Sequence, residues 1–267
     1  ADAVIKFLQK WDPDKALDNP AISENIDEIY KGANFIFRYY GKDNVHNVPA
    51  VNQAWMEYKN KSSDNPVQQC LVTGKLAPIA ILHPDIRGLY KGKSAKIKLV
   101  SYNKHAFESY NTSKKIRQGL NGPVSEYATF AYGTALNSLL ADESRKLILG
   151  DNTVVFWAET SSKVYPDIFS LFMDCSQLYT KDKEKKTVRS PAAEKTVRTV
   201  LEKISQGKVA DVDEVYKETV DKNIQFYILG MSPNAARISV RFYLKGSFGD
   251  FMKKIEQHYD DLAIQKQ

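Results

Sequence analysis

The chain has 267 residues, of which 43% are hydrophobic and 11% aromatic, a composition that is typical of a folded protein and excludes a disordered one. Its 38 Lys and Arg residues against 32 Asp and Glu give a formal charge of +6, and no apolar run reaches the ~18 residues that a membrane span requires. Two cysteines, Cys70 and Cys175, are too few for a disulfide framework or a cysteine-rich zinc site. We therefore expect a cytoplasmic protein that contacts no membrane.

The N-terminal part of the chain, residues 1–65, predicts an α/β segment. Phe35–Tyr40 predicts a strand because it is rich in aromatic residues and ends at Gly41, and Val51–Lys61 predicts a helix. The turn signal Asp64-Asn65-Pro66 separates this segment from the rest of the chain.

Residues 66–160 predict a basic, strand-rich core with a helix over residues 123–141. Residues 71–120 hold ten Lys and Arg against two Asp and Glu, so by subtraction the other 217 residues hold 28 basic and 30 acidic side chains. Positive charge that is concentrated in one stretch and interleaved with aromatic residues is typical of a nucleic-acid-binding surface. The alternative is a lysine-rich surface that only keeps the protein in solution.

Turn signals and side-chain alternation predict the strands of this core. Val67–Val72 and Ile79–Leu82 predict short strands around a turn at Thr73–Lys75. Ala95–Tyr102 predicts a strand in which two lysines and a tyrosine project from the same face.

The predicted helix over residues 123–141 begins at Pro123, because proline suits the first helical position, where its missing N–H is no loss. Gly133 and Asn137 lie four residues apart and so share one face of this helix. A glycine inside a helix costs about 1 kcal/mol relative to alanine, so we expect another segment to pack closely against the backbone there.

The C-terminal half begins with a buried strand at Thr153–Trp157, after which residues 161–190 predict a surface excursion because their charges are mixed and show no period. Residues 191–267 predict an α/β part with helices over 191–207 and 248–259 and strands over 225–229 and 237–244. The order strand, helix, strand, strand, helix is most of the ferredoxin-like (RRM-like) pattern, whose sheet often binds RNA. The predicted fold class is α+β, with mixed and antiparallel sheets and packed helices.

The predicted strand Arg237–Leu244 alternates in polarity. Its even-numbered residues are apolar and are expected to face a core, whereas Arg237, Ser239, Arg241 and Tyr243 are expected to face outward. The two arginines would then reach separate phosphates, with the tyrosine free to stack on a base. It is equally consistent with the pattern that both arginines pair with acidic side chains of a neighbouring element.

The sequence contains no motif that assembles a catalytic site. Gly88–Ser94 resembles a phosphate-binding P-loop, but only three residues separate its glycines, and the segment that follows alternates like a strand. The four histidines are scattered without metal-ligand spacing, and His83 is expected to make a structural hydrogen bond. We therefore expect no cofactor, metal or catalytic residue. A metal-dependent nuclease, or another nucleic-acid-processing enzyme, is the alternative.

Several collinear motifs carry a resemblance to a known family. They are Cys70–Gly74, Ile81–Gly88, Leu99–Asn103, Ala106–Tyr110, Asn121–Ser125, Ala131–Asn137, Asp151–Ala158 and Phe226–Arg241. As a set they resemble the Csd family, the large subunit of the type I-C CRISPR surveillance complex (Cascade). The chain is shorter than members of that family, which implies that it is the central fragment of a longer protein.

The resemblance implies a non-catalytic DNA- and crRNA-binding subunit in antiviral defence. In such complexes the guide RNA reads sequence, while the protein recognises a short duplex flank, the protospacer-adjacent motif, and handles the target strand. The implied partners are target double-stranded DNA, crRNA, the backbone and crRNA-processing subunits of Cascade, and a recruited helicase–nuclease. An acidic anti-CRISPR inhibitor that mimics DNA is a further partner that the basic face would fit.

The candidate nucleic-acid-binding residues come from the basic stretch and from the strand at 237–244. The candidates for phosphate contacts are Lys75, Arg87, Lys91, Lys93, Lys96, Lys98 and Lys104. Asn103, Ser109 and Asn121 are candidates for base edges or sugars, and Tyr110, Arg237 and Arg241 complete the set. Phosphate contacts would give affinity and salt dependence, and base contacts would give sequence preference.

Overall fold

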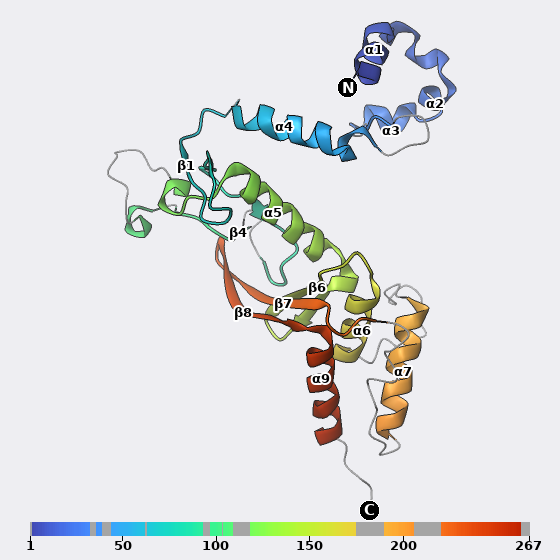
Figure 1. Ribbon diagram of the computed structural model, residues 1–267, viewed down its shortest axis with the longest axis vertical. Helices are drawn as coiled ribbons and strands as arrows, with labels where there is room; N and C mark the ends of the chain where they lie inside the picture. Colours follow the sequence, from blue (N-terminus) through green and yellow to red (C-terminus); the bar gives the residue numbers. More distant parts are fainter. Residues whose placement is uncertain are drawn as a thin grey trace, which may run out of the picture. The chain divides into compact units, whose positions relative to one another are not determined.

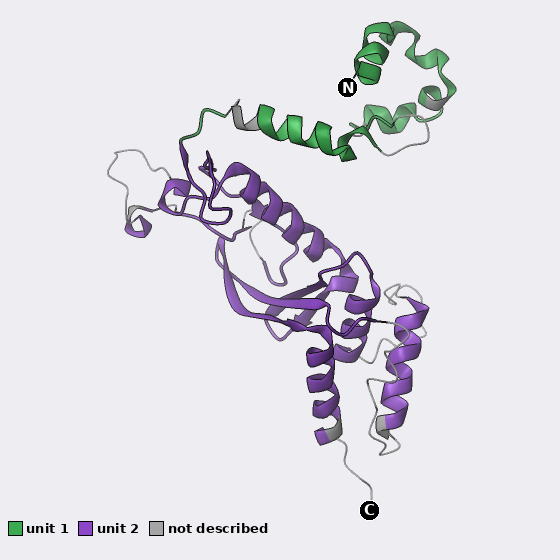
Figure 2. Cartoon of the chain, viewed as in Figure 1, with its two compact units in different colours: residues 1–66 green, residues 67–267 purple. Residues whose placement is uncertain are grey.

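A computed structural model describes residues 2–32, 36–38, 44–61, 63–92, 97–102, 104–108, 118–174, 190–205 and 220–262. The chain divides into two compact units, residues 1–66 and residues 67–267 (Figure 2). In the described residues, no helix is both long enough and apolar enough to cross a membrane.

The described part of the first unit is helical rather than α/β. Its α-helices are α1 (Asp2–Lys10), α2 (Pro20–Ser23), α3 (Ile26–Tyr30) and α4 (Pro49–Lys61). The expected helix at 51–61 is thus confirmed and begins two residues earlier. The expected strand at 35–40 is wrong for residues 36–38, where only Arg38 forms an isolated bridge, to Asn44, and its other residues lie outside the described ones.

The second unit contains two sheets. A two-stranded sheet pairs β1 (Val67–Gln69) with β2 (Leu76–Pro78). A six-stranded sheet has the order β3 (Asp85–Ile86), β4 (Ile97–Lys98), β8 (Arg237–Ser247), β7 (Gln225–Asn234), β6 (Asn152–Ala158) and β5 (Lys146–Leu149). Its pairs are antiparallel except for β4 with β8. The α+β class is therefore confirmed.

Helices pack on both faces of the six-stranded sheet (Figure 1). On the face that we call the α5 face, helix α5 (Glu126–Ala141) packs against Val155 of β6, Met231 of β7 and Ile238 of β8. On the opposite face, the α6 face, α6 (Val164–Met173), α7 (Pro191–Ser205) and α9 (Phe248–Leu262) enclose Phe156 and Phe226. Successive strand residues thus supply the two cores alternately, which is why β6 is apolar from Val154 to Ala158.

The ferredoxin-like order expected for the C-terminal part is not observed. That pattern is a split βαβ unit, in which another strand lies between the two strands that flank the first helix. Here β6 and β7 flank the helices α6 and α7 but are direct antiparallel neighbours, and β8 follows β7 as a hairpin.

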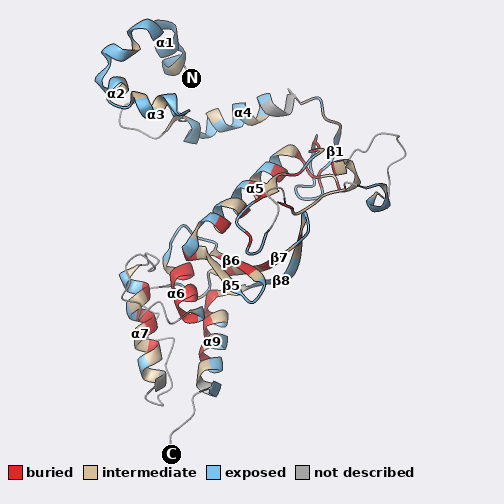
Figure 3. Cartoon of the chain, turned by 180° about the vertical axis from the view of Figure 1, so that it is seen from behind, coloured by how far each residue is buried: buried red, intermediate tan, exposed pale blue. Residues whose placement is uncertain are grey.

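The surface excursion expected at residues 161–190 is wrong for its described helical part. Helix α6 is buried over eight consecutive residues, Tyr165–Phe172, and Figure 3 shows it in red between the sheet and its neighbouring helices. Because α6 is covered on all sides, its apolar residues do not lie on a single helical face. The sequence around it has mixed charges, so the segment was predicted to lie on the surface.

Three predicted elements near the basic stretch differ from the structure. The strand at 79–82 is absent, although Ile79 forms an isolated bridge to Ser125, and of the strand at 95–102 only Ile97–Lys98 is observed among the described residues. Helix α5 begins three residues later than expected, because the Ser125 hydroxyl caps it by accepting a hydrogen bond from the N–H of Ala128. Pro123 instead uses its carbonyl to accept from Leu71 N, at 2.8 Å.

Candidate nucleic-acid interface

Residues 84–92, which comprise β3 and the turn after it and which we call the loop at 84–92, carry two of the predicted phosphate contacts, and α5 fixes the position of this loop. Gly133 leaves room for Pro84: a Cβ at residue 133 would lie 2.3 Å from Pro84 Cγ. Asn137 Oδ1 accepts a hydrogen bond from Arg87 N (2.9 Å), and its Nδ2 donates to Asp85 O (3.0 Å). The expected close approach at Gly133 is thus confirmed, and the motifs Ile81–Gly88 and Ala131–Asn137 prove to be the two sides of one contact.

His83 lies buried beside this contact. Its Nδ1 is 2.6 Å from the hydroxyl of Tyr132, and burial raises the pKa of Tyr132 to about 12, so the hydroxyl keeps its proton and can donate it. Burial, and then the charge of Lys98, lower the pKa of His83, which favours a neutral ring. The expected structural hydrogen bond is confirmed.

Lys98 uses its ammonium group inside the fold. Its Nζ donates to His83 O (2.6 Å) and to Asp85 Oδ1 (2.8 Å), and only 25% of its side chain is exposed. A partly buried cation with a carboxylate partner holds two backbone segments together, so Lys98 serves to position the loop and is poorly placed to meet a phosphate.

The tip of the loop turns sharply and meets β6. Gly88 has a positive φ of 84°, which glycine adopts without strain, and Lys91 has one of 55°. The Tyr90 N–H donates to Thr153 Oγ1 (2.8 Å), and Lys91 Nζ pairs with Asp151 Oδ1 (2.6 Å). The Lys91 ion pair is exposed, and a phosphate group can replace the carboxylate in water. The tip therefore presents Lys91 from a fixed backbone.

A second group of cations gathers where β4 meets β8. The two strands pair at Lys98 and Arg237, and the Arg237 guanidinium lies over the ring of Phe107, 4.1 Å from its centroid. Lys104 is exposed, and its carbonyl accepts from Phe107 N at 2.9 Å. Arg237 thus makes a cation–π contact next to an exposed lysine.

The other predicted site residues make contacts of their own or lie outside the described residues. Lys75 is exposed in the turn after β1, where its carbonyl accepts from Cys70 N, and Asn121 donates from Nδ2 to Gln118 O. Arg241 Nε donates to Ser232 Oγ at 2.7 Å. The candidates that lie outside the described residues are Lys93, Lys96, Asn103, Ser109 and Tyr110.

The outward face expected for residues 237–244 is divided by a β-bulge. Gly230 pairs with Phe242 but Met231 pairs with Val240, so Arg241 is an extra residue and the strand changes face there. Arg237 and Ser239 consequently lie on the α6 face and Tyr243 on the α5 face. Val240 and Leu244, which were expected in a core, are exposed.

The bulge places an aromatic row on the α5 face that was not recognised from the sequence. Trp157, Tyr227 and Tyr243 lie on the neighbouring strands β6, β7 and β8, and their rings stack in that order. Each aromatic residue was visible in a predicted strand or at its edge, but the register that aligns them was not.

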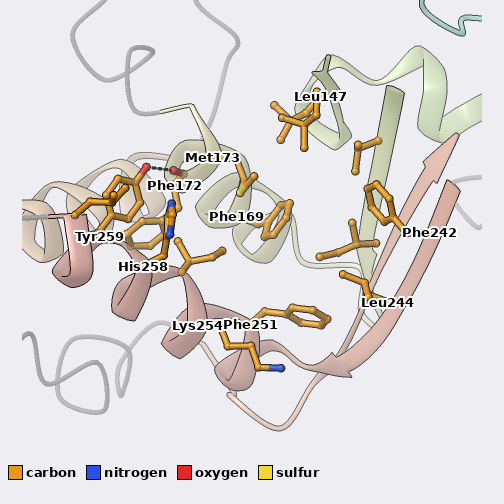
Figure 4. A pocket seen from close by; sticks show the side chains of 15 residues that line it. Leu147, Phe169, Phe172, Met173, Phe242, Leu244, Phe251, Lys254, His258 and Tyr259 are labelled. Atoms are coloured by element: carbon orange, nitrogen blue, oxygen red, sulfur yellow. Dashed lines mark hydrogen bonds between the residues drawn. The ribbon is translucent and has the colours of Figure 1, made fainter. Parts of the chain in front are cut away.

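A groove opens on the α6 face between the sheet, α6 and α9, with a volume of about 590 Å³ (Figure 4). Its lining is almost entirely apolar, with Phe169, Phe251 and Leu244 pointing into it. The Tyr259 hydroxyl, one of the few polar groups in the lining, already donates a hydrogen bond to Phe172 O at 2.6 Å. The groove thus offers apolar contact and little of the converging polar chemistry that catalysis needs.

The described residues hold no cluster of three or more His, Cys, Asp or Glu side chains with the geometry of a metal site. His83, the histidine nearest to the basic loop, is engaged with Tyr132. The carboxylates of Asp85 and Asp151 are each paired with a lysine. Near the loop, the lysines Lys91 and Lys98 are thus held in place by carboxylates.

A family model described as CRISPR-associated protein (Cas_Csd1) matches residues 1–267. No curated protein matches the chain.

Proposed function

Because the chain belongs to this Csd1 family of CRISPR-associated proteins, we propose that it acts as the non-catalytic large subunit of a type I-C surveillance complex. In this role it contacts the duplex that flanks the target, including the protospacer-adjacent motif, and handles the target strand beside the crRNA in the cytoplasm. Its partners are the backbone and crRNA-processing subunits and a recruited helicase–nuclease. The observation that carries the proposal is the family match over the whole chain.

The fixed loop at 84–92 supports a contact with DNA phosphates. Arg87 and Lys91 are exposed on a backbone that Asn137 and Thr153 hold by hydrogen bonds. Cations that are already in position lose little conformational entropy when they bind a phosphate, so each contact keeps more of its free energy.

Within the predicted set we assign two different roles. Arg87, Lys91 and Lys104 are the described cations that we propose to contact phosphates, whereas Lys98 positions the loop through Asp85. In an RNA-guided complex such contacts supply affinity, while base pairing by the guide supplies sequence choice. An acidic protein that mimics DNA would compete for the same side chains.

The test is duplex binding by the assembled complex that carries Arg87→Ala, Lys91→Ala and Lys104→Ala together. The slope of log K against log salt is negative, and each phosphate contact that is removed should make it shallower by about 0.9. The affinity should therefore fall most at low salt, and a titration of labelled duplex at several salt concentrations measures this.

The matched control removes three exposed lysines of α7 and α9 by Lys195→Ala, Lys253→Ala and Lys254→Ala, which changes the net charge equally. The control complex should keep the wild-type slope. Equal slopes for the loop variant and the wild type would contradict the proposed phosphate contacts. Cleavage of labelled DNA or RNA by the purified chain with Mg²⁺ or Mn²⁺ would contradict the non-catalytic role.

A further inference from the structure

Three aromatic side chains form a continuous stack across three strands on the α5 face of the sheet. The ring centroids of Trp157 and Tyr227 are 5.2 Å apart with planes at 12°, and those of Tyr227 and Tyr243 are 6.4 Å apart at 22°. Trp157 and Tyr227 are register partners, and Tyr243 is paired with Leu229, two residues along β7 from Tyr227. The three rings are nearly parallel, so they form one row of aromatic faces across the three strands.

The stack begins at the edge of a core and ends in solvent. Trp157 packs against the apolar cluster under α5, whereas 54% of Tyr243 is exposed. In the described part of the chain β8 pairs with β4 only at Arg237, so Tyr243 lies on an open edge of the sheet. Figure 3 shows much of β8 in pale blue, in contrast to β6. The outer side of the Tyr243 ring is therefore available to another planar group.

The charged groups beside the stack suit a nucleotide backbone. Lys245 is the register partner of Tyr227, and its Nζ lies 5.7 Å from the centroid of that ring. On the other side, Glu159 Oε2 accepts a hydrogen bond from the Tyr227 hydroxyl at 3.4 Å. An exposed ammonium group attracts a phosphate, while a carboxylate repels it but can accept a hydrogen bond from a ribose 2′-hydroxyl.

We propose that Trp157, Tyr227 and Tyr243, together with Lys245 and Glu159, form a stacking platform for unpaired RNA nucleotides. A base extends the aromatic row at Tyr243, Lys245 neutralises a phosphate, and Glu159 accepts from a 2′-hydroxyl, the group that distinguishes RNA from DNA. This site is separate from the basic loop at 84–92. The proposal rests on the proposed function only for the source of the RNA.

The test measures binding of a fluorescently labelled uridine-rich RNA oligonucleotide, and of its DNA counterpart, to the full chain. Tyr243→Ala should weaken RNA binding about 5-fold or more, the loss expected for one base–aromatic stack. Tyr243→Phe keeps the ring and should bind as the wild type does. Lys245→Ala should weaken binding of both oligonucleotides, and Glu159→Gln should reduce the preference for RNA over DNA.

The matched control is Tyr127→Ala, which removes a tyrosine of nearly equal exposure (52%) from α5 and should leave RNA binding unchanged. Unchanged RNA binding by Tyr243→Ala, or an equal loss in Tyr127→Ala, would overturn the platform. Equal binding of RNA and DNA by the wild type would overturn the assignment to RNA. The assay contains no duplex DNA, so a negative result would overturn the RNA platform and leave the proposed duplex contacts standing. Failure of the duplex-binding test would likewise leave the RNA platform standing.

Discussion

On the α6 face of the sheet, Phe156, Phe226 and Phe248 are completely buried among one another and against neighbouring helices. On the α5 face, the loop at 84–92 buries Ile86 and Leu89 in the apolar cluster under α5, and polar groups fix its backbone. Asn137 bonds that backbone, and Lys98 bridges Asp85 to His83. The first region gains its stability from the area of apolar surface that it buries. The second gains a defined position from a few directional contacts.

This difference separates the parts of the protein that keep it folded from the parts that place its cations. Apolar burial is roughly proportional to area and has no direction, so it stabilises a core without fixing a loop to a particular register. Hydrogen bonds contribute less net free energy but demand geometry. A change in the α6-face core should therefore unfold the protein, and a change around the loop should displace the loop while the core persists.

The largest effect is expected for Phe226→Ala in the α6-face core. The Phe226 ring contacts four other phenylalanine rings and is inaccessible to solvent, so its loss leaves a cavity as well as lost apolar contact. The free energy of unfolding should fall by about 3–5 kcal/mol, as measured by denaturant titration. The exposed Phe130 of α5 supplies the control, since Phe130→Ala should change stability by about 0.5 kcal/mol or less. Similar losses for both variants would refute the assignment of stability to this core.

A smaller effect is expected for Gly133→Ala at the contact between α5 and the loop. Alanine improves helix propensity by about 1 kcal/mol, but its Cβ would collide with the ring of Pro84. We expect a net destabilisation of about 1–3 kcal/mol, measured by thermal unfolding. Combining Gly133→Ala with Pro84→Ala, which removes the colliding Cγ, should recover part of the loss. Strictly additive effects in this double-mutant cycle would show that the two residues do not meet.

The smallest effect is a pH dependence that arises at His83. The unfolded chain protonates this histidine at a pKa near 6.5, whereas burial and then the charge of Lys98 lower its pKa in the folded state. The unfolded state therefore binds more protons below pH 6.5, so the free energy of unfolding should fall as the pH decreases from 6.5, by at most about 1.4 kcal/mol per pH unit.

The measurement is denaturant unfolding of the wild type and of His83→Asn between pH 7 and pH 5. Asparagine keeps a hydrogen-bonding group near Tyr132 and does not titrate, so its stability should fall less in this range. His258→Asn, at an exposed position of α9, should retain the wild-type pH dependence. Parallel curves for the wild type and His83→Asn would exclude His83 as the source.

Local patterns predicted the features that depend on neighbouring residues. Gly133 and Asn137 were assigned to one helix face from their spacing, and both face the loop in the structure. Helix α6 was missed because it is buried on all sides and so lacks the one-sided period on which such predictions depend.

Features that depend on partners far away in the chain were not accessible from the sequence. The pairing of Lys98 with Asp85 depends on the register of β3 with β4, so a lysine expected to meet DNA is held within the fold. The aromatic row likewise depends on the registers of β6, β7 and β8 and on the bulge at Arg241. The concentration of positive charge was visible, but which of its ammonium groups reach solvent was not.

The bulge at Arg241 constrains how this hairpin can evolve. One additional residue lets the first half of β8 supply Ile238 to the cluster under α5 while the second half presents Tyr243 on that same face. Loss of a single codon here would restore strict alternation and turn one half of the strand over, exchanging apolar and polar side chains between the two sides. Homologues should therefore tolerate substitutions along this ribbon far more readily than insertions or deletions.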